Sequence, residues 1–466
     1  MPDPAALFNG TLFDVAVIGG GVVGCATARR LALEGAKVVL IEAGRDILAG
    51  ASKANSAILH TGFDATVGSL EAEMIRAGRE EYLAVREELG LPLLVTGAIV
   101  TAWSEGDLAR LDAIAEKARR NGVTDVAMLT PEEVARSEPH LAPTCGGLLV
   151  PGEHIIDPWS APLAYLDHAM ANGAEFLRDA ALSAARFDGS SWRLETAAGT
   201  VLTKWAVNCA GLYGDKVDAM LSGEARFSIR PRKGQFVVFD KAARALLNAI
   251  ILPVPGERTK GVVLCPTIFG NLLVGPTAEE QEDRDAVGVD GATLAALIAK
   301  AAAIVPALAG ASVTAVYAGL RPATEKSEYR LFCDTERQFV TVGGIRSTGL
   351  SAALGLARYV ASAFGLKGAA PARPPLRRAP GLAEHGPRDW QSPGRDEIVC
   401  HCEMVTRREI AAALEGPLGA RDLGGLKRRT RATMGCCQGF YCLARVAAIA
   451  GDRMTPTVPE MAGAHG

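Results

Sequence analysis

Three glycines near the amino terminus are spaced as in loops that bind dinucleotides. Gly19, Gly21 and Gly24 form the pattern G-x-G-x-x-G within VIGGGVVGC. The first permits a tight turn, the second lets backbone approach a pyrophosphate, and the third lets a helix pack closely on a strand. Glu42, at the end of the next apolar run, could accept hydrogen bonds from ribose hydroxyls. The pattern predicts a dinucleotide site; a glycine-rich turn in an unrelated α/β fold is the alternative.

Four cysteines near the carboxyl terminus are spaced so that they could surround a metal centre. Cys400 and Cys402 stand as C-H-C, and Cys437 and Cys442 stand as C-x-x-x-x-C after 34 intervening residues. Tetrahedral sets of thiolates bind zinc or iron–sulfur clusters. Structural zinc sites usually space paired ligands by about two to four residues. These spacings depart from that pattern and favour iron–sulfur, with a zinc knuckle as the alternative.

The elements that must position the glycines form a β-α-β unit. Asp14 to Ile18 and Lys37 to Ile41 are short apolar runs, and Val22 to Glu34 repeats apolar residues at helical spacing. Such a unit has a right-handed crossover and places its ligand at the carboxyl ends of its strands. This unit by itself does not distinguish FAD from NAD.

The middle of the chain predicts a second, sheet-based domain. Strands are expected at Gln235–Phe239, Gly261–Leu264 and Leu272–Val274. Near Gln338 the sequence FVTVGGIRSTG returns to a strand and a glycine turn before another helix. A distant segment therefore completes the nucleotide domain.

Composition limits the classes of function. The 466 residues exceed one ordinary core, which stops growing near about 250 to 300 residues. A formal charge of -3 offers no global field for nucleic acid. No apolar run approaches the ~18 residues of a membrane span, and MPDPAALFNGTLFD is unlike a secretory signal. We expect a cytoplasmic enzyme whose membrane association, if any, goes through a partner, and whose ten cysteines are thiols or metal ligands.

Three separated segments resemble the D-amino-acid-oxidase-like FAD superfamily, and within it the glycerol-3-phosphate dehydrogenase group. They are GASKANSAILHTGFD (50–64), LTKWAVNCAGLYGDKV (202–217) and GGIRSTGLSAA (343–353), and the resemblance runs from about Asp14 to Gly365. It implies that the first glycine turn and Glu42 hold the ADP moiety of FAD. The other cofactor-binding residues that it implies are Ser52, Asn55, Ser56, Ala210, Gly211, Gly344, Arg346, Gly349 and Leu350.

The same resemblance indicates a reacting centre. Flavin would accept a hydride from an alcohol, and His60 could take the hydroxyl proton, since an unperturbed imidazole titrates near about pH 6.5. A structural histidine beside the cofactor is the alternative. Arg321 and Lys260 occupy positions where this family keeps basic residues that face an anionic substrate. A solvated loop lysine is the alternative for Lys260.

The cysteine segment resembles the bacterioferritin-associated-ferredoxin-like domain, which binds a 2Fe-2S cluster. The matching residues include RRTRATMGCCQG (428–439), and in the family pattern the ligand directly precedes Gln-Gly. This makes Cys437 the ligand and leaves Cys436 aside. The neighbouring basic residues Lys427, Arg428, Arg429 and Arg431 are interpreted as a solvated helix face. The alternatives are that they offset the charge of the thiolate-bound cluster or meet an acidic partner.

The expected fold is α/β, with a small helical iron–sulfur domain at the carboxyl end. The boundaries are 12–91, 140–225 and 335–366 for a discontinuous Rossmann-like FAD-binding domain, 92–139 and 226–334 for an inserted substrate domain, 367–396 for a proline-rich linker, and 397–450 for the 2Fe-2S domain.

The expected activity is that of an FAD-dependent dehydrogenase. The first hypothesis is oxidation of sn-glycerol 3-phosphate, with the cluster passing electrons to a second electron-transfer subunit or carrier. The second hypothesis is a 2-hydroxy-acid or amino-acid dehydrogenase. A non-catalytic electron-transfer subunit is the third. All three include FAD and a 2Fe-2S cluster.

Overall fold

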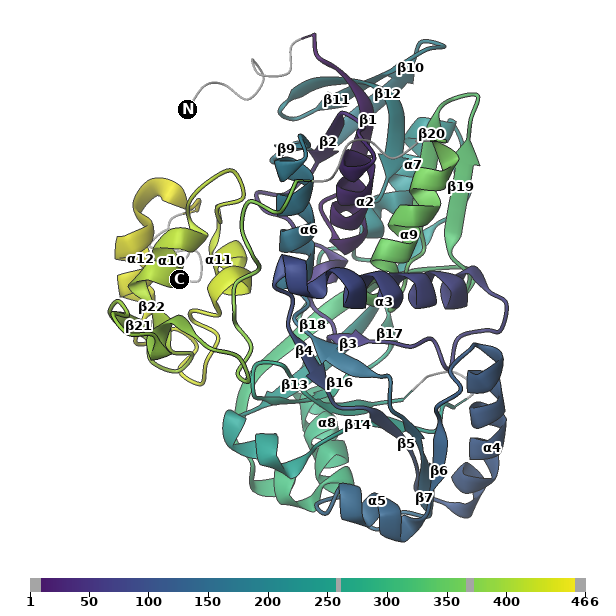
Figure 1. The fold of residues 1–466 in the computed structure, drawn as a ribbon, viewed down its shortest axis with the longest axis vertical. Helices are drawn as coiled ribbons and strands as arrows, with labels where there is room; N and C mark the ends of the chain where they lie inside the picture. The colour runs from purple at the N-terminus through teal and green to yellow at the C-terminus, as the bar shows by residue number, and fades with distance from the viewer. Residues whose placement is uncertain (1–9, 257–260, 366–372, 457–466) are drawn as a thin grey trace.

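The protein is described here by a computed structural model covering residues 10–256, 261–365 and 373–456. Two sheet-based parts are stacked along the long axis, and the carboxy-terminal helical unit lies at their side (Figure 1). Within these described ranges, no helix combines the length and apolar character needed to cross a bilayer.

The first sheet is largely parallel and carries the amino-terminal unit. Its order is β10 (Leu182–Phe187), β11 (Trp192–Thr196), β12 (Gly199–Asn208), β1 (Leu12–Ile18), β2 (Val38–Ile41) and β9 (Glu175–Leu177), with β20 (Phe339–Gly343) beside β12 and β19 (Arg330–Asp334) beside β20. All four residues of β2 are buried, as expected for a parallel strand covered on both faces. The predicted β-α-β unit and its completion by β20 are confirmed.

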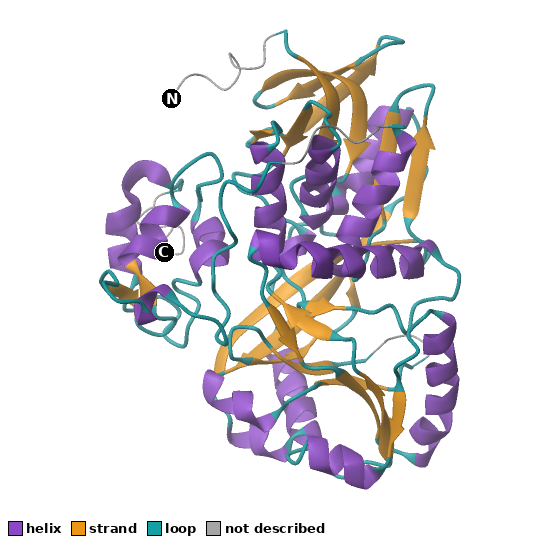
Figure 2. Ribbon diagram, viewed as in Figure 1, coloured by secondary structure: helices purple, strands orange, loops and turns teal. Residues whose placement is uncertain are grey.

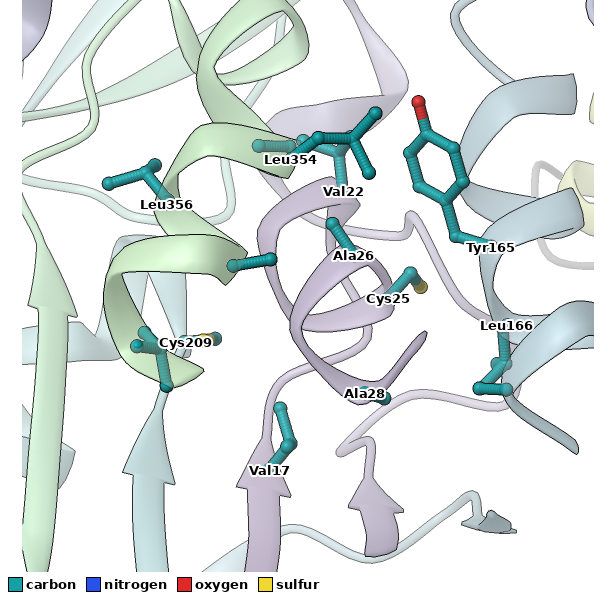
Figure 3. Packing of buried hydrophobic residues seen from close by; sticks show 14 of the residues in the cluster. Val17, Val22, Cys25, Ala26, Ala28, Tyr165, Leu166, Cys209, Leu354 and Leu356 are labelled. Carbon is teal, nitrogen blue, oxygen red and sulfur yellow. The ribbon is translucent and has the colours of Figure 1, made fainter. Parts of the chain in front are cut away.

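Helices cover both faces of this sheet (Figure 2). They are α2 (Val22–Leu33), α3 (Leu70–Leu89), α6 (Ser160–Ala171), α7 (Gly214–Ser222) and α9 (Gly349–Ala363). Figure 3 shows α2 between α6 and α9, with the small side chains of Cys25, Ala26 and Ala28 in the shared core. A Cβ on Gly78 of α3 would lie 2.1 Å from the Ser351 carbonyl oxygen of α9, so this helix crossing depends on glycine.

The second sheet forms the other sheet-based part. Its order is β17 (Glu279–Glu280), β13 (Ile229–Phe239), β16 (Leu272–Gly275), β15 (Val263–Pro266), β14 (Ile250–Pro253), β5 (Ala98–Ala102), β7 (Gly146–Val150) and β6 (Ala127–Leu129), with β18 (Val313–Thr324) beside β13. The helices α4 (Glu105–Arg120), α5 (Pro131–Ser137) and α8 (Gly291–Ile304) pack against it. The three strands predicted from the middle of the chain lie here, as β13, β15 and β16.

The predicted domain boundaries assign two strands to the wrong sheet. β7 falls in the range expected for the FAD-binding domain but pairs with β5 in the second sheet. β19 falls in the range expected for the substrate domain but pairs with β20 in the first. Each of the two strands is antiparallel to its partner. The hydrogen bonds of its backbone are made to that partner, and this places it in the partner's sheet. A small third sheet joins β3 (Ile58–Leu59), β8 (His154–Ile156) and β4 (Leu93–Val95).

The carboxy-terminal unit is small and mainly helical. It contains β21 (Ile398–Cys400), β22 (Val405–Thr406), α10 (Arg407–Ala413), α11 (Leu423–Thr430) and α12 (Leu443–Ala450). Its own core includes Val405, Ile410, Leu426 and Val446, together with two of the cysteines. A unit of this size buries little apolar area, so a metal centre would add stability that its core lacks.

The described part of the proline-rich segment, residues 373–396, packs against the rest of the protein. Leu382 and Ala383 are buried in a hydrophobic cluster with Phe269. The Ala379 N–H donates to the Leu89 carbonyl oxygen at 2.9 Å. This segment therefore holds the carboxy-terminal unit close to the main body instead of spacing it away.

The interpretation of the basic run as a solvated face is wrong for three of its four members. Arg428, Arg429 and Arg431 are 9%, 7% and 5% exposed. Arg429 donates from two nitrogens to the Asp46 carboxylate, at 2.5 and 2.8 Å, and Asp46 is fully buried. Helical spacing alone could not reveal this, because the surface that buries α11 comes from the loop after β2.

We predict that Arg429→Met destabilises the protein by about 3 kcal/mol, because a buried carboxylate that loses its partner stays desolvated and uncompensated. Thermal unfolding and limited proteolysis would show a lower transition and faster cleavage within 373–396. The control is Arg445→Met, which removes an exposed pair with Glu397 and should cost below about 1 kcal/mol. Equal losses in the two variants would contradict the structural role of the Asp46 pair.

Candidate functional site

The carboxyl ends of four parallel strands meet at one edge of the first sheet. Ile18 of β1 is in register with Ile41 of β2 and with Asn208 of β12, and Asn208 is in register with Thr341 of β20. The residues that follow these strands are thereby brought together although they are far apart in the sequence. Ligands of such sheets bind at this edge.

A cavity of about 750 Å³ opens at that edge. Its lining includes the following predicted residues: Gly19, Gly21, Glu42, Ser52, Asn55, Ser56, Ala210, Gly211, Gly344, Arg346, Gly349, Leu350 and Arg321. Gly24 packs behind the lining. Lys260 lies outside the described residues.

Two glycines allow the first helix to approach the first strand. A Cβ on Gly24 would lie 1.9 Å from the Gly19 carbonyl oxygen. Gly19 has a φ of +110°, and a Cβ there would lie 2.5 Å from the Cys209 carbonyl oxygen. Only residues without a side chain fit, so the amino terminus of α2 can reach the cavity with its amide groups and favour an anion.

Glu42 is held at the cavity wall by backbone amides. Its two carboxylate oxygens accept from the Gly20 and Gly44 N–H groups, at 2.6 and 2.7 Å. Burial raises the pKa of this carboxyl, and the two amide hydrogen bonds oppose that rise. Each oxygen keeps a second lone pair, so a ribose can still be bound.

The loop that contains Ser52 and Asn55 closes one wall. Ser52 Oγ accepts from the Val22 N–H at 3.1 Å, at the first turn of α2. Asn55 Oδ1 accepts from the Ala57 N–H at 2.8 Å, and the Tyr317 hydroxyl donates to the Asn55 carbonyl oxygen at 2.8 Å. These bonds tie the loop to both α2 and β18.

Arg321, on β18, brings a half-buried cation to the same cavity. It donates to the Thr277 carbonyl oxygen at 2.7 Å and to two carbonyl oxygens of β13. Burial, together with the nearby Arg232, lowers the pKa of Arg321 to about 10. The guanidinium therefore remains cationic near neutral pH and could attract an anionic group.

His60 lies at the end of β3 and pairs with a carboxylate that sequence reasoning missed. His60 Nδ1 is 2.8 Å from Glu153 Oε2, and Glu153 is fully buried. The other Glu153 oxygen accepts from Thr61, from its N–H at 2.6 Å and from its hydroxyl at 2.8 Å. The His60 N–H donates to Ser351 Oγ at 2.8 Å, on the helix whose first residues line the cavity.

This pair defines what His60 could do. A carboxylate at Nδ1 favours the tautomer with its proton there, makes Nε2 the proton acceptor, and stabilises the imidazolium that forms. Ninety-three residues separate the two side chains. They meet because β3 and β8 are antiparallel, with Leu59 opposite His154. A local sequence pattern carries no sign of that pairing.

The cysteine thiols of the carboxy-terminal unit lie close together in pairs. The Cys402 thiol lies 3.5 Å from that of Cys436 and also interacts with that of Cys437, and the Cys442 thiol interacts with that of Cys400. Among the residues described, no group of three or more His, Cys, Asp or Glu side chains is arranged to hold a metal ion. A 2Fe-2S cluster needs two thiolates on each iron, so paired thiols fit it better than they fit a single tetrahedral ion.

Cys436 and Cys437 differ in their surroundings. Cys436 is exposed. Amide groups of the following turn, that of Tyr441 above all, lower the pKa of the Cys437 thiol and favour its thiolate. Burial raises the pKa of the Cys402 thiol to about 11 and that of the Cys442 thiol to about 12, so a lowered pKa sets Cys437 apart and does not by itself mark a ligand.

Comparisons with known proteins agree with both sites. Residues 14–363 match the family of FAD dependent oxidoreductases, and residues 398–451 match the BFD-like 2Fe-2S binding domain. The cavity and the paired thiols fit these two cofactors, which are FAD and a 2Fe-2S cluster.

Similar proteins include dehydrogenases and an oxidase. The chain is 33% identical to glycerol 3-phosphate dehydrogenase of Caloramator mitchellensis over 469 residues, which cover 97% of each chain. It is 29% identical to mitochondrial L-2-hydroxyglutarate dehydrogenase of Caenorhabditis elegans over 278 residues, which cover 57% of this chain and 63% of that one. The dithionite-reduced L-alpha-glycerophosphate oxidase structure from Mycoplasma pneumoniae, with FAD bound, has a TM-score of 0.72 and 27% identity, covering 77% of this chain and 96% of that one.

We predict that Glu153→Gln and His60→Ala each slow substrate reduction of bound FAD by roughly 10²-fold or more, because proton removal then lacks an oriented base. Glutamine can keep an oxygen for Thr61, so FAD content should stay unchanged. Rapid-mixing absorbance of the flavin measures the rate. His140→Ala, at an exposed histidine, is the control and should leave the rate unchanged. Normal reduction in Glu153→Gln would remove the pair from the mechanism.

We predict that Cys437→Ser abolishes most cluster binding, whereas Cys436→Ser retains it, because an exposed thiol beside the ligand set is not needed for four-cysteine coordination. Iron and sulfide analysis of the purified proteins, with visible spectra after FAD removal, makes the comparison. Loss of iron in the Cys436→Ser protein alone would show that Cys436, and not Cys437, is the ligand. Stoichiometric zinc without iron in the unaltered protein would contradict the cluster itself.

Proposed function

The chain belongs to the family of FAD dependent oxidoreductases and carries a BFD-like 2Fe-2S binding domain, and from this we propose that it is a dehydrogenase of sn-glycerol 3-phosphate. The product would be the ketone, dihydroxyacetone phosphate. The electrons would leave FAD through the cluster and pass to a partner subunit or carrier.

The observations that carry the proposal are the His60–Glu153 pair, which is bonded to the helix whose first residues line the cavity, and Arg321 in the cavity lining itself. Oxidation of a secondary alcohol needs a base for the hydroxyl proton, and binding of a phosphate ester needs a cation. The substrate assignment is supported by similarity to a glycerol 3-phosphate dehydrogenase across 97% of both chains. That relative matches in the cluster domain as well as in the catalytic one.

In the proposed mechanism the chain binds and orients the substrate and moves one proton. His60 Nε2 takes the proton of the secondary hydroxyl, and Glu153 stabilises the resulting imidazolium. Arg321 holds the phosphate, together with Lys260, which lies outside the described residues. FAD, when bound, supplies the acceptor for the hydride.

A second candidate is oxidation of a 2-hydroxy acid. It is favoured by similarity to L-2-hydroxyglutarate dehydrogenase over 57% of this chain. Arg321 could bind a carboxylate as well as a phosphate, since a guanidinium matches both planar and tetrahedral oxyanions. The two candidates share the base and differ in the anion that is bound.

We predict that sn-glycerol 3-phosphate bleaches the bound FAD without oxygen, and that glycerol does so at least roughly 10²-fold more slowly, because glycerol leaves the cationic site unpaired. The panel also contains 2-hydroxyglutarate, lactate, glycine and proline, each followed by flavin absorbance. Appearance of the reduced-cluster signal after flavin bleaching would support electron transfer through the cluster. Bleaching by a carboxylate and not by the phosphate ester would support the second candidate instead.

If no alcohol or amine reduced the FAD while a partner flavoprotein did, the chain would be an electron-transfer subunit without a substrate of its own. The same absorbance measurement, repeated with the candidate partner protein, tests that case.

A further inference from the structure

Two aromatic rings and a guanidinium lie in a continuous line between the FAD cavity and the cysteine-bearing unit. The rings of Trp159 and Phe269 are stacked, with centroids 5.2 Å apart and an interplanar angle of 13°. The Arg431 guanidinium carbon lies 4.1 Å from the centroid of Phe269. The three side chains come from three distant parts of the sequence, and only the folded chain brings them together.

One end of the line is attached to the wall of the FAD cavity. Trp159 Nε1 donates to the Lys53 carbonyl oxygen at 3.0 Å, and Lys53 is one of the cavity-lining residues. Phe269 packs in the cluster that contains Ala57 and Ile58, which continue the same cavity-lining loop toward β3. The line therefore begins directly behind the loop that extends from Ser52 to Ser56.

The other end is attached to a residue next to a cluster ligand. Arg431 Nε donates to Glu403 Oε2 at 2.8 Å, and Glu403 directly follows Cys402 in the sequence. A Cβ on Gly435 would lie 2.2 Å from Cys402 Cβ and 3.3 Å from Glu403 Oε1, so this turn is tightly packed around the ligand. Lys241 also approaches Glu403, at 3.4 Å.

The line is shielded from solvent along most of its length. Phe269 is 6% exposed and Arg431 is 5% exposed. Arg431 has a φ of +65°, an unusual conformation for a residue with a side chain, and its N–H donates to the Lys427 carbonyl oxygen at 2.8 Å. Arg431 is the cap residue at which α11 ends, and its left-handed backbone conformation terminates that helix.

We propose that Trp159, Phe269 and Arg431 form the contact through which electrons pass from the flavin to the cluster. Electron transfer within a protein falls steeply with the gap between centres, and these three π-bearing groups are in packed, non-bonded contact across that gap. Trp159 and Phe269 are positioning residues for this transfer, because neither touches the substrate. The inference rests on the proposed function in one respect, namely that the cluster accepts electrons from the flavin.

The electron balance of the step is simple. Oxidation of the alcohol delivers two electrons to the flavin as a hydride, and the hydroxyl proton goes to the base. The cluster takes one electron at a time, so each flavin reduction needs two transfers along the contact. Between them the cluster passes its electron to a one-electron acceptor outside the chain, such as ferricyanide in the test below.

The test compares Phe269→Leu with Phe269→Tyr. In rapid mixing, flavin bleaching by the substrate should be unchanged in both variants. Reduction of the cluster should slow about tenfold in Phe269→Leu, which corresponds to about 1.4 kcal/mol in the barrier to transfer. Phe269→Tyr keeps the ring and should restore the transfer. Cluster absorbance and the low-temperature electron paramagnetic resonance signal report the reduced cluster.

A matched control separates electron transfer from packing. Phe13→Leu makes the same change in a separate buried cluster, at the amino-terminal end of β1. This control variant should reduce its cluster at the rate of the unaltered protein. In Phe269→Leu the midpoint potentials of both cofactors should also be unchanged. Cluster reduction in Phe269→Leu at the rate of the unaltered protein would overturn the proposal. If Phe269→Leu loses iron, Phe269→Met fills more of the buried volume without a ring and gives the same comparison.

The test also distinguishes failure of the inference from failure of the proposed function. The flavin can be reduced by light with a sacrificial donor, without any substrate. If glycerol 3-phosphate fails to bleach the flavin but photoreduced flavin still passes electrons more slowly in Phe269→Leu, the substrate assignment is wrong and the contact stands. If the substrate bleaches the flavin normally and the ring makes no difference, the contact is wrong and the activity stands.

Discussion

The buried ion pair between Asp46 and Arg429 joins the two cofactor-bearing parts of the protein. Asp46 lies on the loop after β2, four residues beyond Glu42, and Glu42 lines the FAD cavity from the same loop. A fully buried carboxylate needs a partner, and the guanidinium of α11 supplies one with two hydrogen bonds. Gly425 leaves the required space, since a Cβ there would lie 1.8 Å from Asp46 Oδ2. The position of the cysteine unit therefore depends on the loop that holds Glu42 beside the cavity.

The His60–Glu153 pair is a second buried carboxylate held by a partner from a distant part of the sequence, here at the candidate catalytic residue. Glu153 is buried, and its oxygens are taken by His60 and Thr61, which are adjacent in sequence. The small third sheet holds β3 and β8 side by side. That pairing sets the distance between the His60 imidazole and the Glu153 carboxylate. Arg321 reaches the cavity from β18, whose long pairing with β13 makes its position rigid. The proton acceptor and the cation thus come from different sheets. Arg321 lines the cavity, and the His60 N–H is bonded to Ser351, two residues after the start of the helix that borders it.

FAD and a 2Fe-2S cluster in one chain suit the proposed enzyme, which would divide a two-electron oxidation into single steps. The described part of the proline-rich segment lies against the main body, and the buried arginines of α11 do the same from within the cysteine unit. Both features hold the cysteine unit against the main body. A solvated, freely moving domain would not hold a fixed gap, and transfer across a varying gap would be slower on average.

Local patterns in the sequence were enough to predict those features that depend on interactions between residues close together in the chain. The turn at Gly19, the helix after it, the strand ending near Glu42 and the two cysteine pairs follow from steric limits, periodicity and ligand spacing over a few residues. These predicted the fold class, a dinucleotide site and a thiolate metal centre. The choice of FAD and of a 2Fe-2S cluster, and most of the residues that line the cavity, came from the resemblance to known families. The tertiary structure decided which distant groups meet: Glu153 with His60, Asp46 with Arg429, and Phe269 with Arg431. Burial and pairing of a charge depend on the surface that covers it, and for α11 that surface is nearly four hundred residues away in the sequence.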